Sequence, residues 1–267
     1  MQPRVEARVL RAVRGWAWVA EGFRLFRVAP LAWFAMVFAY WMAITLIGLI
    51  PYVGVVIASI LVPAFSVAFM AASRAAELRA PVEIASLGAG FRQNVGAQIR
   101  LGGAYFAAIA AVLAATMLVD EGALAGWMST GARPSAEAIG SDEFIGALLV
   151  AGALYVPVMM AFWFAPVLVA WHGLSAAKAL FFSFFAGLIN WRAFLVYGAG
   201  AALVMFVLPS ALVLGAMLIT GGKARIALLG ALFPFMLMLL PTLFASFYAS
   251  YRDVFGPREE PPVETLR

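Results

Sequence analysis

The single histidine of this chain, His172, is the side chain best suited to ligate a metal or haem or to relay protons. It stands between Trp171 and Gly173, at one end of a long apolar stretch. The chain has no cysteine, and a zinc site takes three or four protein ligands. We therefore predict no metal site and no cofactor. The expected partner of His172 is a helix-end carbonyl or a lipid headgroup, with a phospholipid phosphate or a haem as the alternative.

Two acidic pairs are the other candidates for chemistry. Asp120-Glu121 and Asp142-Glu143 flank segment 120–143, and carboxylate oxygens bind divalent cations. Neighbouring side chains on a helix point apart, so neither pair forms an acid/base dyad. We interpret them as part of a solvated acidic loop, with cation binding as the alternative. Gly221-Gly222-Lys223 lacks the spacing of a phosphate loop. The chain carries no catalytic signature, and we predict that it is not an enzyme.

Six long apolar stretches surround these residues, each free of Asp, Glu, Lys and Arg. Hydrophobic residues make up 65% of the chain and charged residues 12%, and the mean hydropathy is +0.99. About 20 apolar residues, at 1.5 Å each, cross the ~30 Å hydrocarbon core as a helix. The sequence therefore predicts an all-α membrane protein with six transmembrane helices, at about 30–50, 52–73, 101–119, 144–170, 193–219 and 226–251.

The distribution of charge predicts the orientation of these spans. Of the 18 basic residues, all but Arg133, Lys223 and Arg225 lie on one side, in segments 1–29, 74–100, 171–192 and 252–267. Basic loops stay in the cytoplasm, so both termini should be cytoplasmic in a bacterial inner membrane. The first apolar stretch is too long for a signal-peptide core and is predicted to be retained. The net charge of +5 then favours anionic lipid headgroups and not nucleic acid.

The predicted domains follow from these spans. Residues 1–29 form a cytoplasmic basic segment with an interfacial helix. Residues 30–251 form the transmembrane domain, which includes the outer acidic loop 120–143. Residues 252–267 form a cytoplasmic tail that we expect to be disordered.

A repeat organises the predicted spans. Pro63 and Pro241 each precede an arginine by eleven residues, and Pro166 precedes Lys178 by twelve. An amphipathic stretch comes before each pair of spans: apolar residues recur at helical spacing from Trp16 to Phe26, from 84 to 91 and from 175 to 189. The sequence thus predicts three tandem units, each an interfacial helix followed by a transmembrane hairpin. The alternative is that proline is simply common in membrane helices.

Interrupted helices in matching repeats are the best sequence pointer to a substrate site, although the same prolines are also typical of packing kinks. A weakly polar cavity for an amphipathic ligand would be lined by Pro63, Ser66, Pro166, His172, Tyr197, Pro241, Ser246 and Tyr248. Tryptophan and arginine favour the membrane interface. The predicted interfacial anchors are Trp16, Trp18, Arg24, Arg27, Trp191, Arg192 and Arg252.

Several motifs carry a resemblance that covers essentially the whole chain. They are Gly15-Trp16-Ala17-Trp18, Ala161–Pro166, Trp171-His172-Gly173, Asn190-Trp191-Arg192 and Tyr251-Arg252-Asp253. With them the chain resembles a family of polytopic proteobacterial inner-membrane proteins that has no assigned activity. The resemblance implies a location and an architecture. More distantly, the repeat is similar to membrane regions of some glycerophosphodiesterases, whose soluble catalytic domain has no counterpart here.

Two hypotheses of different class remain. The first is a protein that binds or moves a lipid or other amphipathic small molecule. The second is a non-transporting accessory protein that holds another membrane protein, or a second copy of itself, or that shapes local lipid. Small residues four apart let membrane helices approach closely, and they occur at Gly103, Ala107, Ala111 and Ala115. A lipid-modifying enzyme that uses His172 is a third, weaker alternative. Membrane lipids are the expected partners in every case.

Overall fold

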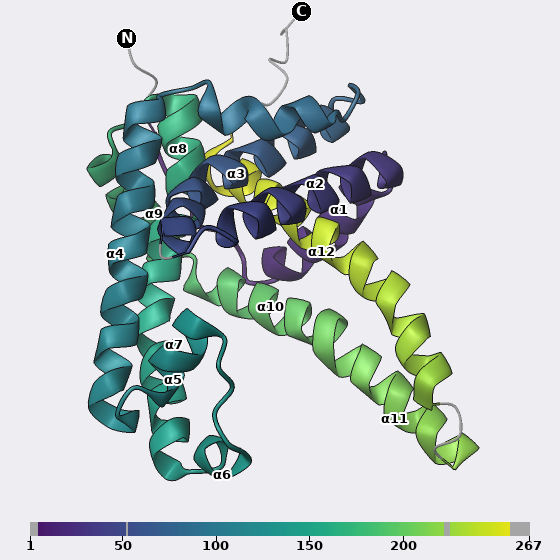
Figure 1. Cartoon of the computed structure of the whole chain (residues 1–267). Coiled ribbons are helices and arrows are strands. Elements are labelled where there is room, and N and C mark those ends of the chain that lie inside the picture. Colours follow the sequence, from purple (N-terminus) through teal and green to yellow (C-terminus); the bar gives the residue numbers. More distant parts are fainter. Residues whose placement is uncertain (1–4, 52, 222–224, 257–267) are drawn as a thin grey trace, which may run out of the picture. The chain divides into compact units, whose positions relative to one another are not determined.

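The computed structural model describes residues 5–51, 53–221 and 225–256, with side chains omitted for 225–237. Every regular element in these ranges is a helix (Figure 1), so the prediction of an all-helical protein is confirmed. Five helical segments are long and apolar enough to cross a membrane. They are Pro30–Gly48, Val53–Glu77, Val95–Asp120, Asp142–His172 and Trp191–Thr220.

These five segments coincide with the first five predicted spans. Three are single helices: α2 (Pro30–Gly48), α3 (Val53–Glu77) and α4 (Val95–Asp120). The fourth consists of α7 (Asp142–Trp163) and α8 (Ala165–His172). The fifth runs through α10 (Trp191–Ala202), a π-helical turn η2 (Leu203–Val207) and α11 (Leu208–Thr220). The sixth predicted range lies on α12 (Arg225–Phe255). The structure omits the side chains of about half of that range, residues 226–237, so the sixth span stays a prediction.

Short helices occupy the remaining predicted elements. The three amphipathic stretches form α1 (Arg14–Phe26), η1 (Ile84–Phe91) and α9 (Ala176–Ile189). Of these, η1 is a 3₁₀ helix, in keeping with the low helix propensity of its glycines. Segment 120–143 contains α5 (Ala123–Thr130) and α6 (Ala136–Ile139). The outer loop is therefore partly helical.

The predicted start of a disordered tail at residue 252 is wrong. Helix α12 continues to Phe255, because Val254 and Phe255 are buried and Arg252 and Asp253 form ion pairs with other helices. The prediction for residues 257–267 falls outside the described part of the chain.

The chain divides into two compact lobes. Lobe 1 comprises Met1–Val37, Phe69–Ile84 and Ile189–Arg267, and lobe 2 comprises Phe38–Ala68 and Ala85–Leu188. In lobe 1, α1 packs along α12 and α10. The approach to α12 is close at Gly22, where an added Cβ would lie 2.4 Å from the carbonyl oxygen of Thr242. Only glycine permits that backbone contact.

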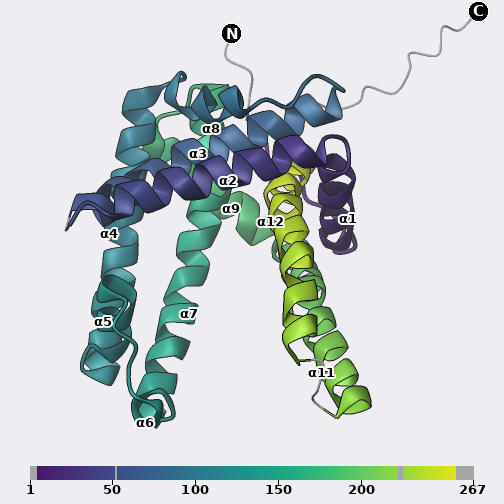
Figure 2. The same cartoon turned by 45° about the vertical axis from the view of Figure 1, so that its right-hand side comes forward.

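In lobe 2, α4 packs along α7, with α5 and α6 beside the same end of α7 (Figure 2). Here η1 meets α3 as closely as α1 meets α12. A Cβ added at Gly90 would lie 2.0 Å from the carbonyl oxygen of Ala64, the residue after Pro63. The same kind of contact therefore joins a predicted interfacial helix to a proline-bearing helix in each lobe.

Candidate functional site

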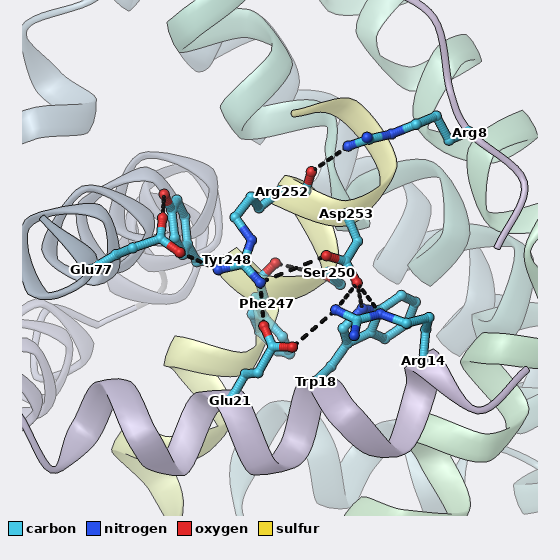
Figure 3. A network of polar contacts seen from close by, with 10 residues as sticks. All are labelled: Arg8, Arg14, Trp18, Glu21, Glu77, Phe247, Tyr248, Ser250, Arg252 and Asp253. Atoms are coloured by element: carbon cyan, nitrogen blue, oxygen red, sulfur yellow. Dashed lines mark hydrogen bonds and ion pairs between the residues drawn. The ribbon is translucent and has the colours of Figure 1, made fainter. Parts of the chain in front are cut away.

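A network of charged side chains joins three helices of lobe 1 (Figure 3). Arg252, near the end of α12, pairs through Nη2 with Glu21 of α1 and through Nη1 with Glu77 at the end of α3. Tyr248 donates its hydroxyl to the second oxygen of Glu77, at 2.5 Å. One guanidinium thus links α1, α3 and α12, because its two terminal nitrogens face different carboxylates.

Asp253 provides the second centre of this network. Its Oδ2 accepts hydrogen bonds from Arg14 Nε at 2.7 Å and from Trp18 Nε1 at 2.8 Å. Arg14 also donates to Glu21, at 2.9 Å. Burial lowers the pKa of Arg14, but hydrogen bonds and charge from Asp253 and Glu21 outweigh it, and the pKa is raised. Burial likewise lowers the pKa of Arg252, and the carboxylates of Glu77 and Glu21 raise it further. Both arginines therefore stay charged.

The amino-terminal segment lies against the same end of α12. Arg8 donates through its backbone to the carbonyl of Val254, at 3.0 Å, and through Nη2 to the carbonyl of Arg252, at 2.8 Å. Asn190, which is buried, donates to the carbonyl of Arg8 and accepts from the amide of Leu10, both at 2.8 Å. The chain's first described residues are thus part of the lobe and not a free extension.

Two residues of the predicted ligand cavity meet next to this network. Tyr197 of α10 and Ser246 of α12 are both buried, and their hydroxyls are 2.7 Å apart. Gly22 of α1 lies against the same turn of α12, where an added Cβ would be 2.8 Å from the amide of Ser246. The predicted lining residues Pro241 and Tyr248 are buried in α12 as well.

The other predicted lining residues, Pro63, Ser66, Pro166 and His172, belong to lobe 2, where one span is broken. Phe164 separates α7 from α8 and has no regular helical structure. Ser183 of α9 bridges the break: it donates to the carbonyl of Met160 at 2.7 Å and accepts from the amide of Phe164 at 2.9 Å. Gln98 of α4 donates through Nε2 to the carbonyl of Pro166, at 2.8 Å. Buried side chains of neighbouring helices therefore satisfy backbone groups beside the break.

Gln98 has an unused hydrogen-bonding group at this break. The residue is 3% exposed, and within the described ranges its Oε1 is buried and has no hydrogen-bond partner. Asn94, one turn earlier, donates to the carbonyls of Val169 and Leu174 on either side of the end of α8, at 3.4 Å each. Both amides thus attach α4 to α8 by side-chain contacts to backbone.

The remaining lining residues of lobe 2 are placed as follows. Pro63 is buried inside α3, and Ser66 is half-buried one turn further on. His172 is the last residue of α8 and is partly exposed. Gly173, with φ +65°, ends that helix.

The predicted interfacial anchors divide into two groups. Trp16 and Trp191 are about half exposed, Arg24 is exposed, and Arg27 and Arg192 lie over the rings of Phe23 and Trp191. Trp18 is instead 0% exposed and, like Arg252, is a member of the ionic network. Glu21, Glu77 and Asp253 were missed as partners, although isolated acidic residues on a basic face were a usable signal.

The acidic pairs of segment 120–143 act at helix starts. Both carboxylate oxygens of Asp120 accept backbone amides, from Gly122 at 3.0 Å and Leu124 at 2.7 Å. Asp142 and Glu143 occupy the first turn of α7, where negative charge complements the helix dipole. Among the residues that the structure describes, no three His, Cys, Asp or Glu side chains group as a metal site would require.

Long apolar helices with buried polar contacts between them define a helical integral membrane protein. The chain is 38% identical over 256 residues to a probable inner membrane protein of Burkholderia thailandensis, an alignment that covers 93% of each protein. The chain therefore belongs to the same family of inner-membrane proteins. No family model matches the chain, and no solved structure does.

Proposed function

We propose that this inner-membrane protein binds, and moves between the leaflets, a lipid or other amphipathic small molecule. The break between α7 and α8 carries the proposal. Broken helices at membrane depth are tolerated where other protein groups satisfy the backbone, and in transporters they form the substrate site. Ser183 and Gln98 provide such groups here. The spans carry no charged side chain at depth, which argues against a pumped proton or metal cation as the ligand.

The same proposal includes six spans, cytoplasmic termini and three tandem units. Supporting it, each predicted interfacial helix packs on a proline-bearing helix. Helix α1 meets α12 after Pro241, η1 meets α3 after Pro63, and α9 meets α7 at Met160, six residues before Pro166. In each case the interfacial helix contacts the span that comes before it in the chain, with α12 counted as coming before α1. Three equivalent units arranged in a ring are expected to show this relationship. The distant similarity to glycerophosphodiesterase membrane regions, and the absence of enzymatic activity, stay predictions.

One observation favours an accessory or self-associating protein as the second candidate. Ala107 and Ala111 of α4 are exposed, and a Cβ added at Gly103 would have no neighbour within 4 Å. These residues form an uncovered small-residue face on a spanning helix, of the kind that packs against another membrane helix. The partner would be a second copy of this chain or another membrane protein, and not nucleic acid.

Native mass spectrometry of the protein in lipid nanodiscs distinguishes the two candidates. The ligand-binding function predicts a stoichiometric lipid or other amphiphile that survives removal of bulk lipid. It also predicts weaker retention in Pro166→Ala and Pro241→Ala variants that still fold. A second polypeptide at a fixed ratio, with no retained amphiphile, would replace it with the accessory function.

A further inference from the structure

We propose that Gln98 Oε1 accepts a hydrogen bond from the head group of the bound amphiphile. The ligand is then a phospholipid whose head group carries an ammonium or hydroxyl donor. This inference rests on the proposed function, since it names the ligand class for the break between α7 and α8.

The orientation of the Gln98 amide is fixed. Its Nε2 lies 2.8 Å from the carbonyl oxygen of Pro166, so exchanging the two amide atoms would place two acceptors against each other. Oε1 therefore remains an acceptor with no donor among the described residues. A buried acceptor without a donor destabilises a fold and calls for an explanation, which a bound ligand supplies.

The position of Gln98 matches the depth of a head group. It is the fourth residue of α4, about 4.5 Å along the axis from the helix start. Two exposed arginines, Arg92 and Arg100, lie close to it in the sequence, on the predicted cytoplasmic side. Guanidinium groups pair with phosphate. These cations share the predicted cytoplasmic interface with the buried acceptor, so the ligand class is a phospholipid whose head group supplies the N–H or O–H donor to Oε1.

Ligand entry requires movement of the broken span. Oε1 is buried, and the same amide bonds to Pro166 of α8, so we infer that a head group reaches it when α8 moves away from α4. Asn94 and Gln98 connect this end of α4 to α8 by hydrogen bonds from their side chains to backbone carbonyls. Because α8 is divided from α7 at Phe164, it can move without unwinding a continuous helix. Head-group binding and movement of α8 are thereby coupled.

The experiment compares lipid retention in nanodiscs of equal parts phosphatidylethanolamine, phosphatidylglycerol and phosphatidylcholine. The ethanolamine head group offers ammonium donors, the glycerol head group offers hydroxyl donors, and the choline head group offers no donor. We expect the wild-type chain to retain one donor-bearing lipid over the choline lipid by about fivefold, the effect of one hydrogen bond. Which lipid is retained distinguishes ammonium from hydroxyl. The Gln98→Met variant should lose the preference and still bind the choline lipid. Gln93→Met, at an exposed position on the same segment, should behave as wild type.

A series on the wild-type chain covers the case in which Gln98→Met does not fold. Ethanolamine lipids with none, one, two and three N-methyl groups should be retained alike until the third methyl removes the last N–H. Equal retention of all the lipids by the wild-type chain would overturn the Gln98 proposal and leave the lipid-binding function intact. A water molecule would then be a sufficient hydrogen-bond donor to Oε1. Retained preference in Gln98→Met would likewise overturn the Gln98 proposal alone. Absence of any retained amphiphile would overturn both.

Discussion

Arg252 pairs with Glu21 across 231 residues of sequence, which joins the last helix of lobe 1 to its first. The same guanidinium also holds Glu77 of α3, and its side chain is 28% exposed. Arg252 is a partner of both carboxylates, whose side chains are 17% exposed in Glu21 and 27% exposed in Glu77, and Glu21 also pairs with Arg14. The arginine is therefore more than a surface charge.

Replacing Arg252 should destabilise lobe 1. We expect Arg252→Gln to lower the free energy of unfolding by about 1–3 kcal/mol, because it removes the charged group that pairs with two part-buried carboxylates. Arg252→Lys should recover less than the full loss, since an ammonium cannot present two forked nitrogens to two carboxylates. Thermal unfolding in detergent measures both. The control is Arg24→Ala, at an exposed position of α1, which should be nearly neutral; an equal loss in the control would contradict the assignment.

A methyl group at Gly22 should separate α1 from α12. The new Cβ of Gly22→Ala would lie 2.4 Å from Thr242 O and 2.8 Å from Ser246 N, both backbone atoms that cannot rotate away. Overpacking of this kind typically destabilises by about 1–3 kcal/mol. The matched control is Gly198→Ala in α10, where nothing lies within 4 Å and alanine should be neutral or stabilising. Thermal midpoints of the two variants should therefore move apart, and coincident midpoints would rule out the close contact.

Removing the Ser183 hydroxyl should weaken the broken span. Ser183→Ala removes the hydroxyl that bonds to Met160 O and Phe164 N at this buried break, for an expected loss of about 1–3 kcal/mol. Ser59 makes the comparable donation to the Val55 carbonyl one turn back on its own helix, at an exposed site, so Ser59→Ala should be within about 0.5 kcal/mol of wild type. Unfolding measured for both variants tests the difference. Two equal effects would mean that the break does not depend on this side chain.

The orientation of the chain can be tested by labelling, because the natural sequence has no cysteine. A single cysteine at Thr130, in α5, should react with a membrane-impermeant maleimide added outside intact spheroplasts. A single cysteine at Glu264 should react only after lysis, since both termini are proposed to be cytoplasmic. The opposite pattern at either position would disprove this topology.

The long apolar helices could be predicted from the sequence, because the length of an apolar run is a local property that depends on no other part of the chain. It also placed α1 correctly from the spacing of Trp16, Val19, Phe23 and Phe26. Trp18 shows where that reasoning stops. Tryptophan next to basic residues is typical of a lipid interface, but here the indole donates to Asp253, 235 residues away, and nothing local to either residue indicates the pairing.

The break at Phe164 was only half predicted. Pro166 indicates a kink, but two separate helices require that Ser183 bridge the freed groups Met160 O and Phe164 N and that Gln98 reach the carbonyl of Pro166, and this depends on how α4 and α9 pack. Gln98 was not a candidate residue at all, because a single amide close to a basic loop is ordinary at the polar end of a membrane helix. Gln98 stands out because its side chain is buried, and the burial of a single residue cannot be read from the sequence.

Lobe 1 also constrains the biogenesis of the protein. The backbone of Arg8 bonds to Val254, and the partners of Arg14, Trp18 and Glu21 lie at the end of α12. Ribosomes add roughly 5–20 residues per second, so α1 waits on the order of ten to fifty seconds for these partners to be synthesised. During that interval Glu21 and Trp18 lack their native contacts to Arg252 and Asp253. A newly inserted chain is thus vulnerable to proteolysis until its carboxyl-terminal helix arrives, and truncation before residue 252 should send the whole protein to degradation.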